Sequence, residues 1–121
     1  MRVIIAGSRS IKGPLSIIDT AIKLSGYEVT EIVSGGAVGV DSLGEEFAIL
    51  NAIKLTRFPV EGFEWRKNPD AGKMRNVRMA RYAEALIAIW DGHSTGTKHM
   101  IQTARSHHLL VSIHRPEVRD G

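Results

Sequence analysis

The sequence predicts a doubly wound α/β sandwich, in which about five parallel strands carry helices on both faces of the sheet. Short apolar runs recur along the chain, and most of them are continuous in Val, Ile and Leu. Continuous runs of this kind are typical of strands that are buried on both faces. Segments with apolar residues at helical spacing lie between the runs. Alternation of strands and helices favours right-handed crossovers and a mostly parallel sheet.

The five apolar runs predict the strands. The first run, RVIIAG, stops at a glycine, and the fourth, ALIAIW, stops at an aspartate. Both runs are therefore followed at once by residues typical of turns. The predicted strands cover residues 2–7, 30–34, 52–60, 85–90 and 109–114.

Two helices are predicted in the first half of the chain. The first follows Pro14, a residue suited to the first turn of a helix, and its apolar positions run from Leu15 to Ile22 at helical spacing. The second covers residues 40–50, where apolar residues repeat at three and four positions. Within it, Ser42 and Glu45 have the spacing of a capping box.

Two further helices are predicted in the second half. One covers residues 71–83 behind Asp70, and the other covers residues 96–106 behind Ser94 or Thr95 as the N-cap. The segment 61–69 between the third strand and the third helix has no clear periodicity. A connection of that length is more typical of a functional flap than of a plain linker.

Length and composition indicate one domain. The chain has 121 residues, of which 43% are hydrophobic and 24% charged, which is ordinary for a globular protein with one core. We expect a single domain over residues 1–114 and a polar tail over 115–121. The absence of cysteine excludes disulfides and thiolate metal sites. The first apolar run is too short for a signal peptide or a membrane span, so we expect a cytoplasmic protein without membrane contact.

The charge of the chain leaves several partners open. The formal net charge is +3, which permits an anionic partner such as a phosphate-bearing ligand or a nucleic acid. A mildly basic surface that only aids solubility is the alternative.

A ligand site is expected where the carboxyl ends of the strands meet. The loops on that edge are 7–13, 34–42, 61–69 and 91–97, and all but the third are rich in Gly, Ser and Thr and lead into helix N-termini. Unpaired backbone N–H groups at a helix N-terminus favour an anion. The predicted ligand-binding residues are Gly7, Ser8, Arg9, Gly35, Gly36, Ala37, Gly39, Asp41, Arg75, Asn76, Asp91, Ser94, Gly96 and Thr97.

Several familiar sites are excluded by spacing. The loop SGGAVGVDS offers Gly-Gly-x-x-Gly, and no Gly-Lys-Ser/Thr follows it, so neither the dinucleotide fingerprint nor the triphosphatase P-loop is present. The five histidines form no zinc pattern, and neither a Cys nucleophile nor a Gly-x-Ser-x-Gly elbow occurs. We therefore expect no metal, no resident cofactor and no acyl transfer. The glycine loop itself is either a phosphate cradle or a tight structural turn.

Individual side chains also allow two interpretations. Arg75 lies near the start of its helix and so near the ligand edge, whereas Arg78 and Arg81 continue a stripe typical of a solvated helix face. Asp41 and Asp91 could cap helices or could bind a ribose hydroxyl or a water. Tryptophans in such positions are mostly packing residues, although a Trp in the flap, at position 65, could cover an adenine.

Four segments resemble a known family in their order along the chain. VIIAGSRS, IVSGGAVGVDSLGEEFA, AGKMRNVRMA and ALIAIWDGHSTGTKHMIQTA resemble the SLOG superfamily, the Rossmann-like group named for the DNA-processing protein A (Smf) and Lonely Guy families. Within it the chain is similar to the small stand-alone YspA/YpsA-related proteins that are frequent in phages and mobile elements. The resemblance covers about residues 2–114. It implies a five-stranded parallel core, a nucleotide-related ligand and a homodimer or higher homo-oligomer.

The resemblance assigns roles to particular positions. Gly35, Gly36, Gly39 and Asp41 correspond to the glycine loop of the family. Ser94, Gly96 and Thr97 correspond to a Gly-Thr loop that receives a phosphate. Arg75 and Met79 match the Arg-x-x-x-Met pattern of Lonely Guy enzymes, with Asn76 where those enzymes have Lys.

One departure from the family bears on function. Lonely Guy phosphoribohydrolases have a catalytic Glu three residues after the Gly-Thr pair, and this chain has Met100 there. A thioether cannot act as a general base or stabilise an oxocarbenium-like centre. The sequence therefore favours binding of a ribose-phosphate ligand, such as an NAD or ADP-ribose derivative or a cyclic nucleotide, over turnover.

Two alternatives stay open. One is an N-glycosidic hydrolase acting on a nucleotide, with Asp41 and Arg75 as the candidate catalytic residues, or with Glu61 or Glu64 in place of the missing carboxylate. The other is single-stranded DNA binding, which the basic stripe permits but does not favour.

Overall fold

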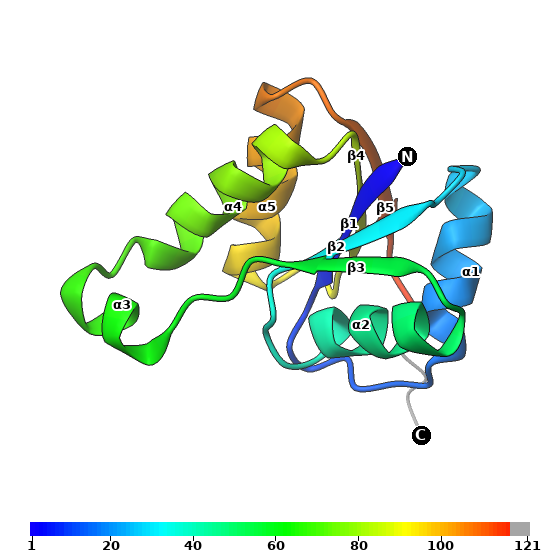
Figure 1. Cartoon of the computed structure of the whole chain (residues 1–121), viewed down its shortest axis with the longest axis horizontal. Helices are drawn as coiled ribbons and strands as arrows, with labels where there is room; N and C mark the ends of the chain where they lie inside the picture. The colour runs from blue at the N-terminus through cyan, green and yellow to red at the C-terminus, as the bar shows by residue number, and fades with distance from the viewer. Residues whose placement is uncertain (117–121) are drawn as a thin grey trace.

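The computed structural model describes residues 1–116 and contains a single five-stranded parallel sheet (Figure 1). Its strand order is β3-β2-β1-β4-β5, and every neighbouring pair is parallel. The predicted α/β fold class is therefore confirmed. The strands are β1 (Arg2–Gly7), β2 (Glu31–Ser34), β3 (Lys54–Arg57), β4 (Ala85–Ile89) and β5 (Leu110–His114).

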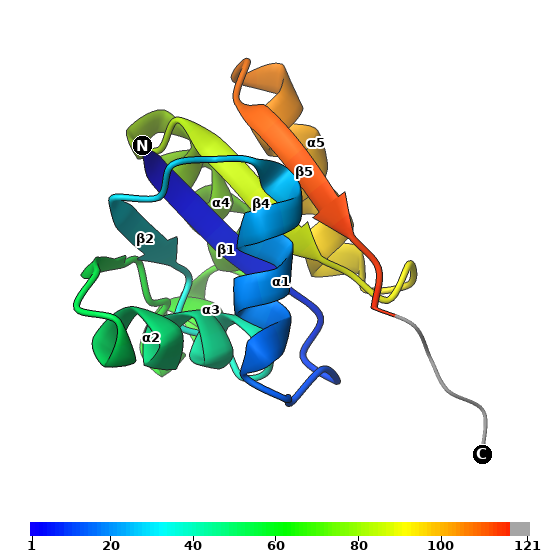
Figure 2. The ribbon, with the colours of Figure 1, turned by 90° about the vertical axis from the view of Figure 1, so that its right-hand side faces the viewer.

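Helices cover both faces of the sheet, as Figures 1 and 2 show. One face carries α1 and α2, which pack on Val3, Ile5 and Ile87 of the strands. The opposite face carries α4 and α5, which pack on Ile4 and Leu86. The alternation of side chains along β1 and β4 thus divides the core into two layers. The helices are α1 (Ser16–Ser25), α2 (Val40–Leu50), α3 (Gly62–Lys67), α4 (Ala71–Tyr82) and α5 (Thr95–Ser106).

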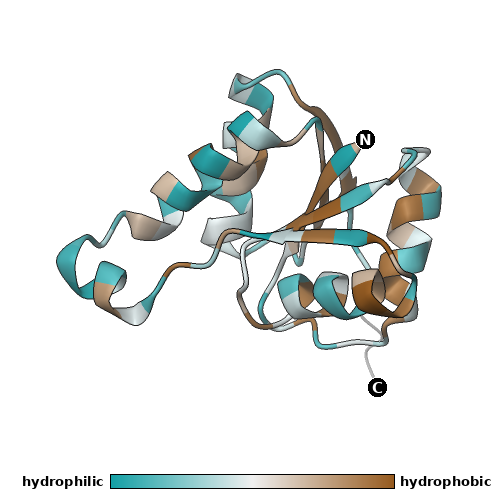
Figure 3. Cartoon of the chain, in the orientation of Figure 1, coloured by the Kyte–Doolittle hydropathy of each residue, from teal (hydrophilic) through white to brown (hydrophobic). Residues whose placement is uncertain are grey.

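Burial differs between the centre and the edges of the sheet. All of β2 and β4 is buried, and so is most of β1. The edge strands β3 and β5 are only partly buried, because each has a neighbouring strand on one side alone. The apolar stretches of the central strands are visible in Figure 3. The expectation of strands buried on both faces is therefore correct for the three central strands and wrong for the two at the edges.

Two predicted segments differ in extent from the structure. The third apolar run forms a strand only over β3, because Ala52 takes a left-handed backbone conformation (φ 53°) and the chain leaves the sheet after Arg57. The segment 61–69, which lacks periodicity, contains the short helix α3. Its N-terminus has a capping box in which the Glu64 carboxylate accepts from the backbone N–H of Glu61 at 3.3 Å. Local capping therefore defines a helix that is too short for a periodic pattern.

The capping box predicted at Ser42 and Glu45 is wrong. Helix α2 begins directly after Gly39, so Ser42 lies inside the helix, where its hydroxyl donates to the carbonyl of Ala37 at 3.0 Å. The Glu45 carboxylate instead accepts from the Ser34 hydroxyl at 2.6 Å. Gly39 occupies the N-cap because its φ is 81° and a Cβ there would lie 2.5 Å from the carbonyl oxygen of Ser8.

The remaining helix starts agree with the sequence within two residues. Asp70 and Ser94 are the N-cap residues of α4 and α5, although neither side chain makes a capping hydrogen bond. Pro14 lies before the N-cap of α1 rather than in its first turn. No helix within residues 1–116 is long and apolar enough to cross a membrane. Most of the predicted tail, residues 117–121, lies outside the described residues.

Candidate functional site

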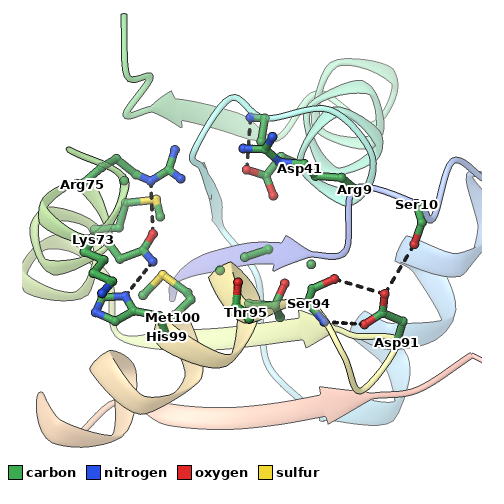
Figure 4. Close-up of a pocket in the computed structure, with 18 of the residues that line it drawn as sticks. Arg9, Ser10, Asp41, Lys73, Arg75, Asp91, Ser94, Thr95, His99 and Met100 are labelled. Atoms are coloured by element: carbon green, nitrogen blue, oxygen red, sulfur yellow. Dashed lines mark hydrogen bonds between the residues drawn. The ribbon is translucent and has the colours of Figure 1, made fainter. Parts of the chain in front are cut away.

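A cleft of about 730 Å³ opens at the carboxyl edge of the sheet (Figure 4). It lies where the strand order reverses between β1 and β4, which is the usual ligand position in open parallel sheets. Its size is within the range of small-molecule sites. Of the predicted ligand residues, those that line it are Gly7, Arg9, Ala37, Asp41, Arg75, Asn76, Asp91, Ser94, Gly96 and Thr97.

The first turn of α5 presents hydrogen-bond donors to this cleft. The backbone N–H groups of Thr95, Gly96 and Thr97 have no hydrogen-bond partner among residues 1–116, and the first intrahelical bond runs from Lys98 N to Ser94 O at 3.1 Å. Thr97 itself also lines the cleft, although the residue as a whole is only 6% exposed. Free N–H groups at the start of a helix are suited to an anionic ligand, and a threonine hydroxyl can add a further donor.

Asp91 holds the loop that precedes α5. Its carboxylate accepts from the backbone N–H groups of His93 at 2.7 Å and of Ser94 at 2.8 Å. These bonds lower the pKa of Asp91 well below its usual range, and the Ser94 and Ser8 hydroxyls add to that effect. Asp91 is therefore a carboxylate that holds this loop in place; it does not cap α5 itself, whose N-cap residue is Ser94.

Ser8 links the two loops that meet at the switch in strand order. It is fully buried behind the cleft, and its hydroxyl lies 2.9 Å from the backbone nitrogen of Asp91 and 3.1 Å from the hydroxyl of Ser94. The loop after β1 and the loop after β4 are thus joined by one side chain. Ser8 does not line the cleft itself, but it holds together two loops that do.

The glycines of the loop after β2 do not line the cleft, and they lie against other parts of the protein. The carbonyl of Gly35 accepts from Arg75, and a Cβ at Gly35 would lie 2.5 Å from the Nη1 atom of that arginine. Gly36 lies against Arg57 and Pro59. In this loop, Ala37 and Asp41 are the predicted site residues that reach the cleft. The small size of the glycines lets neighbouring groups come close enough to form its wall.

Asp41 and Arg75 both line the cleft and are close enough to interact through their charges. Asp41 is only 5% exposed, and its carboxylate accepts from the backbone N–H of Ala37 at 3.2 Å. Burial raises the pKa of Asp41 to about 6, and the Ala37 hydrogen bond and the positive charge of Arg75 oppose part of that rise. Burial likewise lowers the pKa of Arg75, but a guanidinium keeps its charge in proteins. The pair therefore combines a permanent cation with a carboxyl group that titrates near neutral pH.

A second chain of hydrogen bonds starts at the same arginine. The Nε of Arg75 donates to Asn76 Oδ1 at 3.1 Å, so the Asn76 amide nitrogen faces His99 Nδ1, which lies 3.0 Å away. Because an arginine can only donate, this order makes His99 Nδ1 an acceptor and places the ring proton on Nε2. Burial and the nearby Lys73 lower the pKa of His99, which also favours the neutral ring. The network is visible in Figure 4.

The position of the expected catalytic Glu is part of the cleft wall. Met100 is buried there, one turn into α5. Glu61 and Glu64 do not line the cleft, so Asp41 and Asp91 are its lining carboxylates among residues 1–116. No group of three or more His, Asp or Glu residues in the described part of the chain is arranged to hold a metal ion.

Several residues that line the cleft are not among the predicted ligand residues. Lys73 and His99 belong to no recognisable motif, and the sequence left Trp65 open between packing and ligand contact. Their place in the cleft depends on how α3, α4 and α5 pack, which no local pattern reveals. The other lining residues outside the predicted set are Ala6, Ser10, Pro69, Gly72, Met79, Thr95 and Met100.

The fold and the site define a class: an α/β protein of Rossmann-like architecture with a donor-rich cleft at the switch in strand order. Comparison with protein families, with curated proteins and with solved structures gives no match.

Proposed function

We propose that this protein binds a nucleotide-related ligand through its ribose-phosphate part, and that it senses or sequesters that ligand. The observation that carries the proposal is the first turn of α5, whose free N–H groups belong to residues Thr95, Gly96 and Thr97 that line the cleft. Arg9 and Arg75 add positive charge to the same cavity. Backbone N–H groups and arginine side chains together are suited to binding a phosphate group.

Membership of the SLOG superfamily is part of this proposal. The four matching segments all contribute residues to the cleft or to its support, and the parallel sheet is the one that the resemblance implies. Met100 at the position of the family's catalytic Glu supports binding over hydrolysis. The homodimer that the resemblance implies remains a prediction, which light scattering of the purified protein would check.

Two exposed cations of one loop provide a matched test. Arg9 lines the cleft, whereas Lys12 in the same loop does not. We expect Arg9→Ala to weaken binding of AMP or ADP-ribose about tenfold, which corresponds to about 1.4 kcal/mol, and Lys12→Ala to leave it unchanged. Isothermal titration calorimetry measures both variants. Failure of AMP, ADP-ribose, NAD and cyclic dinucleotides alike to bind the wild-type protein would refute the proposal.

A hydrolase is the second candidate, and Asp41 is the observation that favours it. A carboxyl group with a pKa of about 6 inside a cleft, beside an arginine, is a candidate general base. Its carboxylate would take a proton from the water that attacks C1′ as the bond to the base breaks, and the proton would pass to the leaving base. We propose this reaction only as the alternative to binding without turnover.

Chromatography of nucleotides incubated with the protein decides between these candidates. If the protein is a hydrolase, release of the free base should rise with pH through about 6 and should fall at least about a hundredfold in Asp41→Asn, because the carboxylate is the active form. The variant Glu46→Gln, an exposed position on the same helix, is the control. Intact nucleotide after prolonged incubation at high protein concentration would exclude this candidate.

A further inference from the structure

Trp65 occupies an unusual position for a large aromatic side chain. It belongs to the short helix α3, which projects away from the sheet together with the start of α4 (Figure 1). The residue lines the cleft and is 41% exposed. A partly exposed side chain alone would need no explanation, but Trp65 combines its exposure with a place in the cleft wall.

The indole rests on the first turn of α4. A Cβ at Gly72 would lie 2.6 Å from Cη2 of Trp65, so the ring occupies the space that any larger side chain at position 72 would take. The outer edge of the indole is therefore held against the backbone of α4, and the residue as a whole still opens to the cleft. An aromatic ring that is held at its edge and opens to a cleft is suited to stacking with another flat ring.

Trp65 and the first turn of α5 line the same cleft from separate elements. Gly72, the neighbour of Trp65, directly precedes Lys73, and Figure 4 shows Lys73 and His99 at one end of the view and Ser10 and Asp91 at the other. A ligand that spans the cleft thus meets donors at the start of α5 and an aromatic ring on α3.

We propose that Trp65 is a stacking platform for a nucleobase, which makes a nucleotide with an intact base the preferred ligand over a ribose phosphate alone. The inference rests on the proposed function, because it needs the phosphate to bind at the start of α5. It assigns the part of the cleft beside α3 to the base and makes Trp65 the residue that determines this preference.

The test compares AMP with ribose 5-phosphate in calorimetric titrations of the full chain. Base stacking on an aromatic side chain contributes roughly ten- to a hundredfold in affinity, so wild type should prefer AMP by about that factor. In Trp65→Leu the preference should fall to near unity, while binding of ribose 5-phosphate stays the same. Trp65→Phe should keep most of the preference, and quenching of tryptophan fluorescence by AMP should be lost in Trp65→Leu.

Phe63→Leu is the matched control. Phe63 is an exposed aromatic of the same helix that does not line this cleft, so its replacement should leave both affinities unchanged. Equal affinity of wild type for the two ligands would overturn the stacking proposal and leave phosphate binding intact. If Trp65→Leu lowered the affinity for both ligands equally, the stacking proposal would also be overturned, because the ring would then only hold α3 in place. Absence of binding by either ligand would refute the proposed function itself.

Discussion

At the scale of single residues, the environment of Asp41 is the feature with the clearest physical consequence. The sequence identified Asp41 as either a helix cap or a site residue, and the structure places it on the cleft wall with its carboxylate nearly buried. That burial could not be predicted, because it depends on how α2 packs against loops from β1 and β2. The raised pKa follows mainly from this burial, and the negative charge of Glu45 adds to it.

Asp41 should therefore make the stability of the protein depend on pH. Its pKa is about 6 in the folded protein and about 3.9 in an unfolded chain, so between these values the folded state binds more protons and its stability falls as the pH rises. The free energy of unfolding of Asp41→Asn, relative to that of wild type, should therefore rise by up to about 3 kcal/mol between pH 4 and about pH 6.5. Urea denaturation at a series of pH values measures this difference. A constant difference across that range would contradict the raised pKa.

At the scale of elements, most helices and strands were predictable because their signals are local. Continuous apolar runs and helical spacing located every strand and four of the five helices, although β3 is shorter than its run. Helix α3 was missed because six residues are too few for a period to show. The edge position of β3 and β5 was also not predictable, since strand order is a property of the whole sheet.

Strand position should decide the energetic cost of losing an isoleucine side chain. Ile87 in the central strand β4 is fully buried, whereas Ile113 in the edge strand β5 is 39% exposed. We expect Ile87→Ala to lower the free energy of unfolding by about 2 to 5 kcal/mol and Ile113→Ala by about 1 kcal/mol or less. Denaturant midpoints of the two variants test this. Similar losses in both would show that Ile113 is covered in solution, for example by a second copy of the chain.

At the scale of the whole molecule, charge is distributed unevenly over the two faces of the sheet. Helices α4 and α5 contain no Asp or Glu, whereas on the other face α1 contains Asp19 and α2 contains Glu45 and the exposed Glu46. This asymmetry is the structural basis for the nucleic-acid alternative. The basic residues of α4 and α5 are Lys73, Arg75, Arg78, Arg81, Lys98 and Arg105.

Salt dependence separates that alternative from ligand binding in the cleft. We expect a single-stranded oligonucleotide to bind weakly and to be released between about 50 and 200 mM salt, because the contacts are to exposed phosphates. The double variant Arg78→Ala, Arg81→Ala should weaken this binding further and leave AMP affinity unchanged, since neither arginine lines the cleft. Tight oligonucleotide binding that persists at 200 mM salt would make nucleic acid the favoured partner.

The sequence by itself determined the fold class, the order of strands and helices, and the edge of the sheet where the cleft lies. These follow from periodicity and from helix starts, which depend on residues close together in the chain. Only the tertiary structure decided that the glycines of the β2 loop do not line the cleft, that Asp41 is buried where the charge of Arg75 acts on it, and that Trp65 rests on Gly72. The physical reason is that each of these arrangements depends on how separate elements pack together. The distances between packed elements cannot be derived from the residue pattern of any one segment.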